Sequence, residues 1–173
     1  MAFTLYDATV PVFAQILGGL SGVLEKAEKH CADKGVAAEE CVGGRLFEDM
    51  LPLGFQVQQT AAHSVGALEA VQRGVFSPMI APFPESFAGL KGAVATAIAA
   101  LERFSPADVN ALVGRDMRFE FRERRLDFTA EDFLMSFSLP NFFFHASTAY
   151  DILRHKGVPL GKRDFMGALR LKQ

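Results

Sequence analysis

Apolar residues recur at three- and four-residue steps along the start of the chain, which predicts an amphipathic helix running to about Asp33–Gly35. The repeating positions are Val10, Phe13, Leu17, Leu20 and Leu24. Asp7 is the predicted N-cap, and Pro11 still lies in the first turn, where its missing N–H does little harm. Gly18, Gly19 and Gly22 lie inside this helix, and the close approach of another helix would compensate for their low helical propensity.

The same spacing predicts two more long helices. One begins near Leu51-Pro52 and ends before Gly74, and the other runs from Pro84 or Ser86 to Arg103. Residues 74–83 contain two prolines and no helical period, so they are expected to form a connection. Shorter helices are expected within 36–50 and after Ser105, which a proline and an acidic residue follow.

The pattern changes to strict alternation over residues 117–128, which predicts a small β-hairpin with a charged turn at 123–125. Thr129 then caps a fourth long helix, and Asp132 at its third position adds a capping-box interaction. Pro140 should kink or interrupt this helix, and Gly157 should end it.

Four long helices in one chain of this length favour an all-α fold, a four-helix bundle formed by one domain over residues 1–173. The second helix is roughly 30 Å long. Ten extended residues reach about 33 Å. The 74–83 connection could therefore either cross the length of the bundle, which would make the second and third helices parallel, or form a hairpin.

Composition narrows the function only by exclusion. The net charge of −2 gives no general electrostatic reason to bind nucleic acid or an anionic membrane. No stretch approaches the roughly 20 consecutive apolar residues of a membrane span, and no signal peptide is evident. Cys31 and Cys41 are too few for a disulfide framework. We therefore expect a cytoplasmic protein with reduced thiols.

His145 is the main candidate for chemistry. Asn141 precedes it by four residues, so the two side chains share a helix face among Phe142, Phe143, Phe144 and Ala146. A polar pair one turn apart inside an apolar bundle helix can form a metal or small-ligand site. The alternative is a pair of core polar groups that neighbouring atoms satisfy.

At this point the chain resembles the DinB-like superfamily of bacterial four-helix bundles, in one of its branches of unknown function. The similarity rests on the segments Leu5-Tyr6-Asp7, 49–53, 56–58, 139–145 and 157–161, and it covers nearly the full length. The resemblance implies an up-down-down-up order, which agrees with a long 74–83 crossover. It also implies metal-dependent hydrolysis or transfer onto a small thiol.

In that superfamily a His-xxx-His pair on the last helix and a third His on the second helix hold a divalent metal. In the superfamily an arginine and then a glycine follow the second histidine of the pair. Here His145, Arg154 and Gly157 match that spacing. Asn141 replaces the first histidine, and glutamines including Gln56 stand near the start of the second helix. Because amides are weak ligands for zinc, we expect a degenerate Zn or Ni site with His145 as its one strong ligand.

The expected pocket is formed by Gln56, Asn141, His145 and Arg154, and it could bind a small polar molecule. His63 is expected on an exposed polar face, with a pocket wall as the alternative.

Three further features are given structural roles: Asp49 in a turn, His155 at a helix end and the mixed charges of the hairpin on a solvated face. The functional alternatives are a non-catalytic ligand-binding or structural homodimer and, more remotely, a redox protein acting through Cys31 and Cys41.

Overall fold

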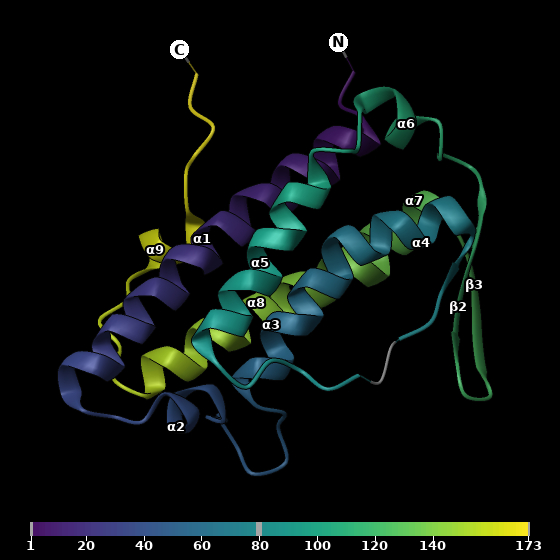
Figure 1. Ribbon diagram of the computed structural model, residues 1–173. Coiled ribbons are helices and arrows are strands. Elements are labelled where there is room, and N and C mark those ends of the chain that lie inside the picture. Colours follow the sequence, from purple (N-terminus) through teal and green to yellow (C-terminus); the bar gives the residue numbers. More distant parts are fainter. Residues whose placement is uncertain (1, 79–80, 173) are drawn as a thin grey trace.

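The computed structural model describes residues 2–78 and 81–172, which are mostly helical with one small mixed sheet (Figure 1). The first half of the chain forms α1 (Leu5–Lys34), α2 (Ala38–Val42), α3 (Leu53–Ala61), the π-helix η1 (Ala62–Gly66), α4 (Ala67–Arg73) and strand β1 (Val75–Phe76). The second half forms α5 (Phe87–Leu101), α6 (Pro106–Asn110), β2 (Asp116–Phe121), β3 (Arg124–Thr129), α7 (Ala130–Asp132), the π-helix η2 (Phe133–Ser138), α8 (Leu139–His155) and α9 (Lys162–Met166).

The long helical segments expected from the periodicity are present. α3, η1 and α4 follow one another without a break, as do α7, η2 and α8. α1 packs against α5, α8 and α9, while α3 packs against α8 and α5. Figure 1 shows α1 and α5 side by side, with the β2–β3 hairpin beyond the ends of α4 and α7.

By length and composition α1 could cross a membrane, but half of its most apolar window is buried inside the fold. Its inward face carries fully buried Phe13, Leu17 and Leu24, which is the pattern of a core helix.

The start of α1 differs by three residues from the sequence prediction. Thr4, and not Asp7, is the N-cap: the Asp7 N–H donates to Thr4 Oγ1, and the Thr4 N–H donates to Asp7 Oδ2 at 3.0 Å. The acid therefore occupies the third helical position of a capping box. The helix ends as expected, with Gly35 in the left-handed conformation.

The hairpin is confirmed, but it belongs to a sheet of three strands. β2 and β3 are antiparallel, and β1 pairs parallel with β2 through Val75↔Arg118 and Phe76↔Phe119. β1 lies inside the segment predicted to be a plain connection. A two-residue strand is too short to produce an alternating signal, because its pairing comes from the neighbouring strand and not from its own sequence.

The cysteines correct another expectation. Cys31, in the last turn of α1, and Cys41, in α2, form a disulfide and are both buried, whereas the sequence favoured reduced thiols. Ten positions separate them, so the bond closes a short loop around the end of α1.

Gly19 is the one glycine of α1 at which a close neighbour leaves no room for a side chain. A Cβ built on it would collide with the backbone oxygen of Phe165 in α9, whereas nothing lies within 4 Å of the corresponding position on Gly18 or Gly22. The expected close approach is therefore confirmed at Gly19 and wrong at the other two glycines.

Replacing Gly19 by alanine should push α9 away and lower the free energy of unfolding by about 1–3 kcal/mol, the usual cost of overpacking. The exposed Gly18→Ala is the matched control, and it should be neutral or stabilising by up to about 1 kcal/mol because it only adds helical propensity. Urea unfolding of both variants measures the difference. Equal stability of the two would contradict the packing of α9 against Gly19.

Reducing the Cys31–Cys41 disulfide should lower the free energy of unfolding by about 3 kcal/mol, because the bond restricts a short loop in the unfolded chain. Urea unfolding with and without a phosphine reductant measures this effect, and a Cys31→Ala/Cys41→Ala variant should be insensitive to the reductant. Alkylation of both thiols in the non-reduced, unfolded protein would show instead that the bond does not form.

Candidate functional site

Two π-helical turns meet where the continuous helical segment α3–η1–α4 packs against the segment α7–η2–α8. η1 contains His63, and η2 ends at Ser138, just before Pro140 in the first turn of α8. Pro140 has no N–H to donate to the carbonyl four residues earlier, which favours a local change in the hydrogen-bond ladder. π turns of this kind are frequent at functional sites.

A buried hydrogen-bond pair joins the two turns. The Ser138 hydroxyl donates to the backbone oxygen of His63 at 3.0 Å, and the Ser138 Oγ lies 3.3 Å from His63 Nδ1. Because the hydroxyl proton is directed at the carbonyl, the Oγ can only accept from Nδ1–H. The network therefore assigns the proton of His63 to Nδ1 and leaves a lone pair on Nε2.

His145 is held in the same tautomer by Gln56. The Gln56 Nε2 donates to the backbone oxygen of Leu51 at 2.9 Å, which fixes the orientation of the amide. Its Oε1 then accepts from His145 Nδ1–H at 2.7 Å. His145 consequently also carries its lone pair on Nε2.

The two imidazoles lie nearly parallel, with ring centroids 5.8 Å apart and an angle of 15° between the planes. Phenylalanine rings surround them: Phe76 stacks on His63 at 5.3 Å, Phe137 tilts against it, and Phe55 and Phe144 meet His145 edge-on. The pair is thus set in an aromatic frame, and no carboxylate of the described residues hydrogen-bonds to either ring to stabilise an imidazolium charge.

Burial keeps both rings neutral at pH 7. Desolvation, with a smaller contribution from repulsion by His145, lowers the pKa of His63 from 6.5 to about 4. Desolvation also lowers the pKa of His145 to about 4. At neutral pH the site therefore presents two uncharged hydrogen-bond acceptors.

The residues expected to form one pocket are separated in the structure. Gln56 and His145 are in direct contact, but the Asn141 Nδ2 donates to the backbone oxygen of Phe137 at 2.7 Å. The Arg154 Nη1 donates to the backbone oxygen of Val158 at 3.1 Å, where it supports the chain beyond α8. Neither Asn141 nor Arg154 has a hydrogen bond to the histidine pair.

His63 was expected on an exposed face, and that expectation is wrong, because only 6% of the residue is exposed. A signal for its position did exist in the sequence. His63 follows Gln56 by seven residues, or two helical turns, so the two share a face. The widened π turn that completes its placement against Ser138 has no comparable sequence signal.

The donor atoms do not fit a tightly held metal of the type that the resemblance implies. A catalytic zinc centre needs three protein ligands. Within residues 2–78 and 81–172 no three His, Cys, Asp or Glu residues come together as a metal-binding group. Gln56 cannot readily serve as a third ligand, because its oxygen is engaged by His145 Nδ1–H.

Comparisons with known proteins place this geometry in a family context. The sequence model of a family described as "Domain of unknown function (DUF1993)" matches residues 5–166. The chain is also similar to the crystal structure of a DinB family member protein from Shewanella denitrificans. The TM-score is 0.81 and the sequence identity 30%, over 98% of this chain and 95% of that one. No curated protein matches the sequence significantly.

The lowered pKa values predict a pH-dependent stability. The unfolded chain binds a proton on each histidine below about pH 6.5, whereas the folded chain does so only near pH 4. Stability should therefore be fully present above pH 6.5 and fall as the pH drops toward 4, by up to about 1.4 kcal/mol per pH unit for each histidine.

Urea unfolding between pH 4.5 and 7.5 measures this slope, which should be smaller in the His63→Gln and His145→Gln variants. His155→Gln is the control, because His155 is exposed and lies outside the pair. An unchanged slope in both site variants would show that the two histidines are not held neutral.

Proposed function

The chain belongs to the DUF1993 family, and we propose that it is a DinB-like four-helix bundle that binds a small molecule at the His63–His145 pair without catalysing its conversion. The observation that carries this proposal is the shared tautomer. Both Nδ1–H groups are engaged by protein acceptors, and no described residue hydrogen-bonds to either Nε2. Two lone pairs are thus left for a ligand.

Both nitrogens can accept hydrogen bonds, because each carries a lone pair that no described residue uses. Two neutral acceptors inside an aromatic frame suit a flat, largely apolar molecule with hydroxyl or amine donors. A carboxylate or phosphate does not suit the pair, because it would place acceptor against acceptor.

The proposal includes an up-down-down-up order of the four helical rods α1, α3–α4, α5 and α7–α8. The long segment between Arg73 and Phe87 supports it, because it is long enough to return along the second rod before α5 begins. The similarity to the DinB family member structure supports the same order.

Metal-assisted hydrolysis, or transfer onto a small thiol, is the second candidate function. One observation favours it: metal-ligating histidines also have the second ring nitrogen anchored by a protein acceptor, as His63 and His145 do here. With two imidazoles as the strong donors, any divalent ion would be held weakly.

Cytoplasmic location and homodimer formation stay predictions from the sequence. Exposed Phe144, at 57% of its surface, supports an association surface on α8. Size-exclusion chromatography with light scattering tests the dimer.

The Cys31–Cys41 disulfide weighs against a permanently reducing environment such as the cytoplasm.

A thermal-shift screen of uncharged aromatic alcohols and amines tests the binding proposal. A binding compound should raise the melting temperature of the native protein, and the rise should disappear in His145→Gln, because the anchored acceptor is lost. His155→Gln should retain it. Failure of every compound to stabilise the native protein would contradict the proposal.

Elemental analysis of the purified protein separates the two candidate functions. We expect far less than one equivalent of Zn or Ni, and only weak binding when either ion is added. Near-stoichiometric metal that is lost in both His63→Gln and His145→Gln would instead favour metal-assisted chemistry.

A further inference from the structure

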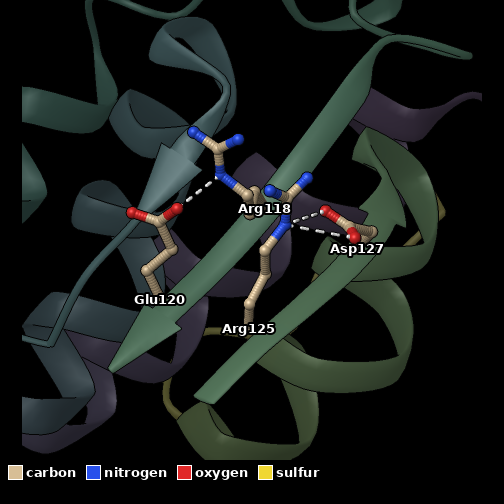
Figure 2. A network of polar contacts seen from close by, with 4 residues as sticks. All are labelled: Arg118, Glu120, Arg125 and Asp127. Carbon is tan, nitrogen blue, oxygen red and sulfur yellow. Dashed lines mark hydrogen bonds and ion pairs between the residues drawn. The ribbon is translucent and has the colours of Figure 1, made fainter. Parts of the chain in front are cut away.

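The outer face of the hairpin carries a charged cluster that the histidine pair does not use. Arg118 and Glu120 on β2, and Arg125 and Asp127 on β3, share this face, with Arg118 opposite Asp127 and Glu120 opposite Arg125 (Figure 2). Because side chains alternate along a strand, Phe119 points the other way and packs on Phe137 beside the histidines.

Each arginine is held by one nitrogen only. Arg118 Nε lies 2.7 Å from Glu120 Oε1, an ion-pair contact without hydrogen-bond alignment, and Arg125 Nε donates to Asp127 at 3.0 Å. Within residues 2–78 and 81–172 no acceptor hydrogen-bonds to an Nη atom of either side chain. Figure 2 shows the terminal nitrogens of Arg118 turned away from the Glu120 carboxylate, and no dashed line reaches a terminal nitrogen of either arginine.

A hollow of about 370 Å³ lies beside the two guanidinium groups. Gly74, Asp116, Met117, Arg118, Arg125, Asp127 and Phe128 line it. Asp116 is exposed and forms no ion pair with a described residue, in contrast to Asp127. The hollow therefore offers free guanidinium nitrogens and one free carboxylate.

The charges decide which ligand fits. Two guanidinium groups and two aspartates line the hollow, so its formal charge cancels, and a simple anion would gain little from the net field. Asp116 and Arg118 are two positions apart on one strand, which separates them by about 6–7 Å along the sheet. A molecule with a carboxylate next to an ammonium group spans such a gap.

We propose that this hollow binds a small zwitterion with the chemistry of a free α-amino acid. Its carboxylate accepts hydrogen bonds from the Nη atoms of Arg118 and Arg125, which can form the fork-shaped pairs that planar carboxylates favour. Its ammonium group donates to Asp116. The side chain of the ligand would extend outward from the open hollow.

Titration of the full-length protein with each of the twenty standard amino acids, followed by the backbone amide shifts of residues 116–129, tests the proposal. At least one amino acid should shift these amides at millimolar concentration. For the best amino acid, the analogue without the amine and the analogue without the carboxylate should each bind about tenfold more weakly or worse, since each loses a charge-assisted contact.

Asp116→Asn and Arg118→Gln should weaken binding similarly, and Arg124→Gln is the control, because Arg124 lies at the turn and does not line this hollow. If the amide chemical shifts of residues 116–129 stay well dispersed in a variant, that variant has kept the folded hairpin. The proposal is overturned if no amino acid shifts the hairpin amides, or if the analogue without the amine binds as tightly as its parent.

Discussion

The contact between the second helical rod and the last one depends on two imidazoles, buried His63 and half-buried His145, remaining uncharged. His63 and His145 lie 5.8 Å apart among phenylalanine rings, so a proton on either would be poorly solvated and would repel a proton on the other. Ser138 and Gln56 meet this constraint. The Ser138 Oγ accepts from the Nδ1–H of His63, and the Gln56 Oε1 accepts from the Nδ1–H of His145. The Ser138 hydroxyl and the Gln56 amide in turn donate to backbone carbonyls. Both Nδ1–H groups are thus satisfied without an ion pair, while the two Nε2 lone pairs have no partner among the described residues.

This arrangement also explains why the last helix is irregular at the site. A regular helix through Pro140 would leave a carbonyl without its donor, and the π turn of η2 changes the ladder just before the proline. η1 is irregular at the matching place on the other rod. Both irregularities place a polar residue, His63 or Ser138, where it meets its partner across the interface.

The helices and the hairpin could be predicted from the sequence because periodicity and capping are local properties. Thr129 and Ser105 accept hydrogen bonds at the helix starts where they were expected. β1 could not be predicted in the same way, because its partner strand lies far along the chain, and neither could the π turn that completes the position of His63, because it changes the helical geometry. The Cys31–Cys41 bond joins residues only ten positions apart, but two cysteines alone give no signal that they pair. At the site, the sequence did indicate Gln56 and His145, but it grouped them with Asn141 and Arg154, whose side chains serve nearby carbonyls of their own segment.

The docking of α9 on Gly19 has a consequence for how the chain folds. The first helix reaches its final surroundings only when residues about 145 positions later arrive, since Asp164 pairs with Lys26 and the Gln15 side chain donates to Met166. Contacts of such long sequence separation form slowly, because much of the chain must be ordered before they can close. The face of α1 that α9 covers therefore stays open until the chain as far as Met166 can fold back onto it.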